Sequence, residues 1–249
     1  MPASTLRCPG CGAPAAADAQ HCNYCGSALA TVTCASCFAP MFKGSRFCSQ
    51  CGAEATRQVL DDAPLKCPRC RAEMQALLLG TLRARECAEC GGLWIAPDTL
   101  QNLCNAREAH SGVIGALAAR IPNNTTPPDI VQYLPCPQCT GLMNRTNFGK
   151  SSGVVIDVCK RDGVWFDRGE LQRVIGFVDA GGLTAQRERD REQLADEQRR
   201  LATMQAYGGG PISVTRSYNS VVIHGGKSDS MSTDGVEGIL LQIAGLFHG

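Results

Sequence analysis

The chain has 249 residues, a formal charge of +1, 16 cysteines and only 5% aromatic residues. Such a composition excludes a single large hydrophobic core and favours small modules that are held together by metal. The N-terminal sequence lacks the apolar core of a signal peptide, and no stretch reaches the roughly 18 to 20 apolar residues of a membrane span. We therefore expect a cytoplasmic protein whose cysteines, in a reducing compartment, bind metal instead of forming disulfides.

Residues 1–60 contain eight cysteines in two copies of the pattern Cys-x2-Cys-x10-Cys-x2-Cys, which repeat with a period of 26 residues. Two Cys-x2-Cys knuckles place four thiolates at the corners of a tetrahedron, the arrangement that Zn²⁺ closes in a structural site. Glycine follows the second knuckle of each copy, at Gly26 and Gly52, where a turn favours a residue without a Cβ atom. The pattern predicts one zinc ribbon over residues 1–30 and a second over 31–56.

The segments CPGCG, HCNYCG and FCSQCG make this block resemble the double zinc ribbon family over its whole length. Its large apolar residues are few, so it cannot offset its chain entropy without metal. Structural zinc supplies roughly 10 to 16 kcal/mol in finger peptides, and we expect the block to fold only with zinc. His21, beside Cys22, is expected on the solvent side because four cysteines already complete the site.

Residues 64–110 predict a third ribbon that is followed by a helix. Two cysteine knuckles flank a hairpin, whose strands are expected over 74–79 and 82–85 around Gly80. Trp94 is expected to cover the sheet. A helix is expected to begin at Pro97, because proline is tolerated at the first helical position.

Residues 128–180 repeat this plan with an altered second knuckle. The first knuckle is Cys136-x2-Cys139 and the second is Cys159-x2-Asp162, where Asp162 replaces Cys90 of the third ribbon and one residue is deleted after it. Three completions of this site are open. Asp162 could supply an oxygen ligand, a water could take the fourth position, or the module could lack metal.

The CPxC start, the second knuckle, Gly-x-Trp and an acidic helix start ending in Glu-Leu make residues 64–105 and 131–178 resemble the bacterial transcription factor zinc-finger ribbons. Those ribbons are similar to the ribbon of general transcription factor IIB. The third ribbon departs slightly, with Gly-Gly-Leu-Trp and Thr-Leu. In the fourth, Asp167 and Glu170 have the spacing of a capping box, and Asp157 is assigned to the hairpin surface. The resemblance implies a ribbon fold, but likeness of fold alone does not give function.

Four Zn²⁺ ions are therefore predicted. Their ligands are, in chain order, Cys8, Cys11, Cys22, Cys25, Cys34, Cys37, Cys48, Cys51, Cys67, Cys70, Cys87, Cys90, Cys136, Cys139, Cys159 and Asp162. Pairing within each repeat is assumed from the spacing, and an exchange between adjacent ribbons stays open. Cys104 lies outside the knuckles and aligns with Ile175 of the fourth module, so we interpret it as a core residue. No acid–base pair accompanies the metal, so we predict no catalytic residues and no enzyme.

The remainder of the chain predicts a charged, solvated helix over 183–207 and a mostly flexible tail over 208–249. Apolar residues at helical spacing over 236–247 predict a short amphipathic helix near the end of the tail. That helix could lie on the chain's own ribbons, on a second copy, in a partner's groove or on a membrane surface. The fold class is thus four tandem zinc ribbons, the last two each with a C-terminal helix, then a charged helix and a tail.

Two functions follow from these features. Arg145 and Lys150 surround Phe148 at the tip of the fourth hairpin, and an exposed Phe148 among basic residues suits nucleic acid, although an ordinary solvated hairpin has the same residues. Bound as thiolates in four zinc sites, the cysteines would lower the formal charge to about −6, which disfavours phosphate. We therefore favour a non-enzymatic adaptor or scaffold that contacts a protein partner or a second copy. The alternative is a transcription-associated DNA- or RNA-binding zinc-finger protein.

Overall fold

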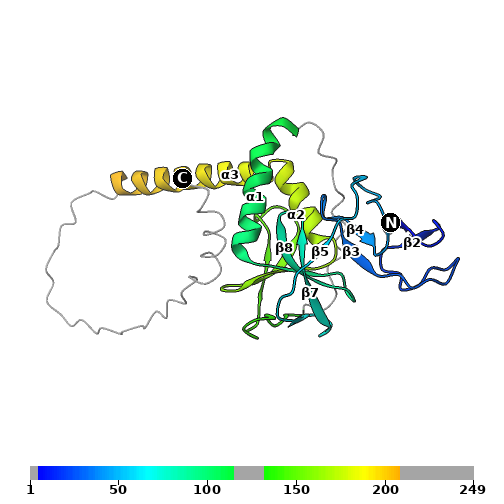
Figure 1. Ribbon diagram of the computed structural model, residues 1–249. Helices are drawn as coiled ribbons and strands as arrows, with labels where there is room; N and C mark the ends of the chain where they lie inside the picture. Colours follow the sequence, from blue (N-terminus) through cyan, green and yellow to red (C-terminus); the bar gives the residue numbers. More distant parts are fainter. Residues whose placement is uncertain (1–4, 115–131, 208–249) are drawn as a thin grey trace.

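The computed structural model describes residues 5–114 and 132–207, in which the four predicted ribbons form short hairpins (Figure 1). The first ribbon contains β1 (Thr5–Arg7) and β2 (Pro14–Ala16), and the second contains β3 (Thr31–Thr33) and β4 (Pro40–Phe42). The third contains β5 (Gln58–Val59), β6 (Leu65–Lys66), β7 (Glu73–Leu79), β8 (Leu82–Cys87) and β9 (Leu93–Ile95), followed by α1 (Pro97–Ile114). The fourth contains β10 (Asn144–Asn147), β11 (Val155–Cys159) and β12 (Gly163–Phe166), followed by α2 (Glu170–Asp179).

The charged segment forms α3 (Gly182–Tyr207), close to the predicted span, and α1 begins at Pro97 as predicted. The predicted capping role of Asp167 was wrong, because the N-cap of α2 is Gly169, which has no side-chain cap. The Glu170 carboxylate does accept a 2.8 Å hydrogen bond from the Asp167 backbone N–H. The predicted tail and its amphipathic helix over 236–247 lie outside the described residues. Among the described helices, none combines the length and apolar character that a membrane crossing requires.

The third and fourth ribbons share one eight-stranded sheet, a feature that sequence reasoning missed. The strand order is β10-β11-β12-β9-β8-β7-β5, and β6 also pairs with β7. The two ribbons meet where β12 pairs with β9 in antiparallel fashion, and this register sets Trp165 opposite Trp94. Equivalent strands of the two repeats therefore form the centre of the sheet.

Alternation along the strands divides the sheet into two apolar faces. One face is covered by α1 and α2, which lie side by side (Figure 1). Its core includes Leu77, Ile95, Leu100, Ile156 and Val174. The opposite face carries both tryptophans together with cysteines of the third and fourth metal groups. One face is therefore a helix-covered core, and the other is built around metal ligands.

The double ribbon contacts the shared sheet and helices of the third and fourth ribbons through specific side chains. Phe38 of the second ribbon is buried in the helix-covered core. The buried carboxylate of Glu86 accepts a 2.6 Å hydrogen bond from the Thr33 N–H and forms an ion pair with Arg57. Paired in this way, the carboxylate does not bear the full cost of burying a charge. Arg168 adds a 2.9 Å hydrogen bond to the carbonyl oxygen of Ala17.

Candidate metal centres

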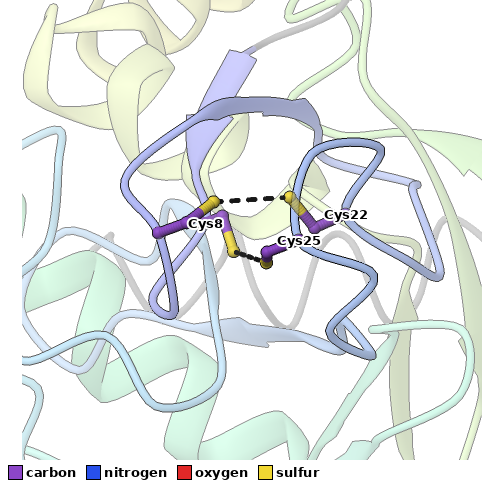
Figure 2. A group of neighbouring side chains, drawn as sticks. Cys8, Cys22 and Cys25 are labelled. Atoms are coloured by element: carbon purple, nitrogen blue, oxygen red, sulfur yellow. Dashed lines mark hydrogen bonds between the residues drawn. The ribbon is translucent and has the colours of Figure 1, made fainter.

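The four predicted ligand sets come together as four separate groups, each within a single ribbon. In every group the candidate donor atoms lie within 4.8 Å of one another. Figure 2 shows part of the first group, in which the thiols of Cys8, Cys22 and Cys25 approach one another. The exchange of ligands between adjacent ribbons, which the spacing left open, does not occur in these groupings. None of the 16 cysteines forms a disulfide, and 15 of them belong to the four groups.

The distances between donor atoms match the size of a zinc site. A tetrahedron with zinc–sulfur bonds of about 2.3 Å has sulfur–sulfur edges of about 3.8 Å. The Sγ–Sγ pairs with short approaches in the four groups are 3.3 to 3.8 Å apart. The ligand sets therefore fit Zn²⁺, and the chain has up to four zinc-binding sites.

The local backbone explains why the knuckles present their thiols together. The residue after a knuckle lies in the left-handed region in every knuckle except the last, and there the backbone turns back toward the first cysteine. The residues concerned are Gly12, Gly26, Phe38, Gly52, Arg71, Gly91 and Thr140. Backbone N–H groups in these turns point at sulfur, as at Ser36 N to Cys34 Sγ and Gln138 N to Cys136 Sγ, both 3.4 Å. Such donors stabilise a thiolate, which is the form that binds metal.

The fourth site includes the carboxylate of Asp162. Its Oδ2 lies 3.4 Å from Cys136 Sγ and 3.1 Å from Cys159 Sγ, while the sulfurs of Cys139 and Cys159 are 3.7 Å apart. Zinc bonds of about 2.3 Å to sulfur and 2.0 Å to oxygen require an edge of about 3.5 Å. In the absence of metal, the nearby Cys139 thiol holds the pKa of Asp162 below its usual value. This geometry supports the set of three cysteines and one aspartate.

We expect Asp162→Ala to lower the zinc content of the gel-filtered full-length chain from four equivalents to three, because a single oxygen donor is lost from the weakest ligand set. Metal analysis by mass spectrometry measures this content. The matched control is Asp61→Ala, which removes an exposed aspartate outside the ligand groups and should leave four equivalents. A full fourth equivalent in Asp162→Ala would remove the aspartate from the ligand set.

Two residues outside the ligand groups lie as predicted. Cys104 is fully buried in the helix-covered core, in the same apolar cluster as Ile175. Burial raises the pKa of its thiol to about 12, so it stays protonated at neutral pH. His21 is exposed and is not among the donors that cluster around Cys22.

Two predictions about the fourth hairpin were wrong. Phe148 is only 2% exposed, because its ring packs edge-on against Phe177 of α2 at a centroid distance of 6.2 Å. It therefore offers no stacking surface for a base. Asp157 is 4% exposed instead of lying on the surface, and burial raises its pKa to about 6. It stands opposite Trp165 in the sheet, so it lies on the same face as this buried tryptophan.

Sequence reasoning also missed the side chains that connect the metal sites. Arg69, between the cysteines of a knuckle, donates hydrogen bonds of 2.8 and 2.5 Å to the carboxylate of Asp167. The same carboxylate accepts a 3.1 Å hydrogen bond from Trp165 Nε1. Arg168 donates a 3.2 Å hydrogen bond to the carbonyl oxygen of Cys90. The partners lie 98 and 78 residues apart in the chain, so no local pattern could reveal them.

Comparison with known proteins agrees with these groupings. The family model described as "Double zinc ribbon" matches residues 8–52, and the model described as "Transcription factor zinc-finger" matches residues 66–106 and 135–176. Searches of curated proteins and of solved structures gave no match. The first two ribbons are therefore similar to the double zinc ribbon family, and the third and fourth are similar to the transcription factor zinc-finger family.

Proposed function

We propose that the chain is a non-enzymatic adaptor of the cytoplasm, in which zinc builds a rigid body that contacts other macromolecules, mainly proteins. Each metal group offers four donor atoms, enough to fill a tetrahedral coordination shell. Zinc that is coordinated in this way stabilises the fold and has no open position for a substrate. Sixteen free thiols suit a reducing compartment.

The observation that carries this proposal is the outer half of α3. All residues over 191–204 are exposed, and the helix extends away from the sheet in Figure 1. Leu194, Leu201 and Met204 are 58%, 60% and 72% exposed. Their spacing places them along one side of the helix, where they suit recognition by an apolar groove. The base of α3 is fixed by an ion pair between Arg187 and Glu108, so the body would present this stripe in a defined direction.

A second candidate, nucleic-acid binding, is favoured by one feature of the double ribbon. The guanidinium of Arg46 lies over the ring of Phe47, 5.4 Å from its centroid, and Phe47 and Tyr24 are both exposed. Aromatic and basic side chains in this arrangement suit single-stranded nucleic acid. The name of the family that matches the larger ribbons also refers to transcription. We rank this candidate second, since the zinc-loaded chain would carry a formal charge of about −6.

A salt series on the zinc-loaded full-length chain tests the proposal. We expect no submicromolar binding to mixed duplex or single-stranded nucleic acid at either about 50 or about 200 mM salt, the range over which phosphate contacts lose affinity. Submicromolar binding at low salt that falls steeply at high salt would favour the second candidate. In that case Phe47→Ala should abolish binding, whereas Val59→Ala, at another exposed apolar residue, should not.

A pair of charge variants tests the stripe on α3. When the chain is immobilised and washed at high salt, any protein that stays bound to it should no longer bind the variant Leu194→Glu/Leu201→Glu. Apolar contacts survive high salt, but a charge that is buried in the interface disrupts them. Ala195→Glu/Ala202→Glu adds the same charge at the same spacing on another side of the helix, and it should retain them. Equal retention by both variants would contradict the role of the stripe.

A further inference from the structure

The two tryptophans of the chain occupy equivalent places in the two larger ribbons and meet at the centre of the shared sheet. Trp94 lies on the last strand of the third ribbon and Trp165 on the last strand of the fourth. Around this pair the register is symmetric, since Val164 lies opposite Ile95 and Phe166 lies opposite Leu93. The ribbons are therefore related by an approximate two-fold axis that passes between the indoles.

Each indole lies against the second knuckle of the other ribbon. A Cβ atom on Gly92, two residues after Cys90, would stand 2.1 Å from Cζ2 of Trp165. A Cβ atom on Gly163, directly after Asp162, would stand 2.6 Å from Cζ2 of Trp94. Only glycine leaves room for these approaches. The position of each tryptophan thus depends on the backbone beside a metal ligand of the neighbouring ribbon.

Other contacts join the same two sites. Cys67 and Cys87 of the third site lie in one apolar cluster with Cys136 and Cys159 of the fourth, and both tryptophans belong to it. Arg69, from a knuckle of the third site, holds Asp167 at the junction between β12 and α2, and that carboxylate also holds the Trp165 indole. Thiols of the first site belong instead to a separate cluster.

The geometry points to coupled metal binding: the third and fourth sites take up and release their two Zn²⁺ ions as one unit, each ion raising the affinity of the other site. Zinc at one site orders the knuckle on which the opposite tryptophan rests, and the ordered tryptophan supports its own ribbon. Coupling between two binding sites is reciprocal and is typically worth about 5- to 150-fold in affinity. The fourth site, with one carboxylate in place of a thiolate, depends most on its neighbour.

The test strengthens one site and observes the other. Asp162→Cys gives the fourth site the fourth thiolate that Cys90 supplies in the third. During a chelator challenge of the zinc-loaded full-length chain, thiol alkylation is followed at each cysteine by peptide mass spectrometry. We expect Asp162→Cys to slow alkylation of Cys70, in the third site, by at least about fivefold. Alkylation of Cys11, in the first site, should be unchanged.

A variant that weakens zinc binding at the third site tests the coupling in the opposite direction. Cys70→Ser should speed alkylation of Cys139 in the fourth site, whereas Cys11→Ser, which removes an equally exposed ligand from the first site, should not. Unfolding of the Cys70→Ser chain would also speed this reaction, so the Asp162→Cys arm decides. The proposal is overturned if Asp162→Cys protects Cys139 while Cys70 reacts at the wild-type rate.

Discussion

Removal of zinc should unfold the double ribbon completely, the largest effect that we expect from any change to this protein. The apolar clusters of the two small ribbons consist mostly of cysteine and alanine. The larger residues are Leu6, Leu29 and, from the second ribbon, Phe42 in one cluster, and Val32 and Met41 in the other. Clusters of this size cannot offset the conformational entropy of the chain. Structural zinc contributes about 10 to 16 kcal/mol per site in finger peptides, so the metal decides whether the block folds.

Hydrogen exchange measured by mass spectrometry on the full-length chain follows this unfolding. With chelator, peptides from residues 5–56 should lose all protection, and added zinc should restore it. Peptides from α1 and α2 should keep partial protection, because Leu100 and Val174 pack in a core that contains no metal ligand. A chelator already saturated with zinc is the control and should change nothing. Native-like protection over 5–56 in the presence of chelator would contradict the prediction.

The ligand sets and hairpins could be predicted because their determinants are local. Two cysteines separated by two residues form a knuckle within a single turn, as the backbone hydrogen bond from Arg71 N to Cys67 O shows. The alignment of the two larger repeats was sufficient to place Cys104 in the core, since Ile175 occupies the equivalent position. The residue types and their spacing were therefore sufficient for these predictions, without any knowledge of tertiary contacts.

The remaining features depend on contacts between distant segments. Phe148 looked exposed because a hairpin tip with basic residues is usually solvated, but Phe177 of α2 covers it. Asp157 has a sequence context that suits a surface strand, yet the register with β12 places it on the same face as the buried Trp165. A periodicity argument treats each ribbon by itself, so it could not show that two ribbons share a sheet.

The second large effect should come from a single methyl group at the junction of the two ribbons. Gly92→Ala places a Cβ atom 2.1 Å from Cζ2 of Trp165, a distance that requires the ring or the knuckle to move. The backbone of Gly92 is not left-handed, so the cost is steric and not conformational. Overpacking of this kind costs about 1 to 3 kcal/mol, and occasionally more. Thermal unfolding of the zinc-loaded chain should show a melting temperature lower by at least about 2 °C.

The control is Gly141→Ala, also next to a knuckle, where the nearest atom to the new Cβ would be Cys139 Sγ at 3.6 Å. It should leave the melting temperature nearly unchanged. An equal fall in the melting temperature of both variants would show that any alanine beside a knuckle is destabilising. It would contradict a specific role for the contact between Gly92 and Trp165.

A double-mutant cycle assigns the cost to one ring. Trp165→Phe removes Cζ2 and Cη2, the two indole atoms nearest to the added methyl group, so Gly92→Ala should cost less in that background than in the wild type. Trp94→Phe should give no such relief, because Trp94 rests on Gly163 instead. Relief from Trp165→Phe alone would demonstrate the crossed arrangement, in which each zinc ribbon supports the tryptophan of the other. Equal relief from both would mean that the junction is only generally tight, and the sheet would then join the two ribbons without linking their metal sites.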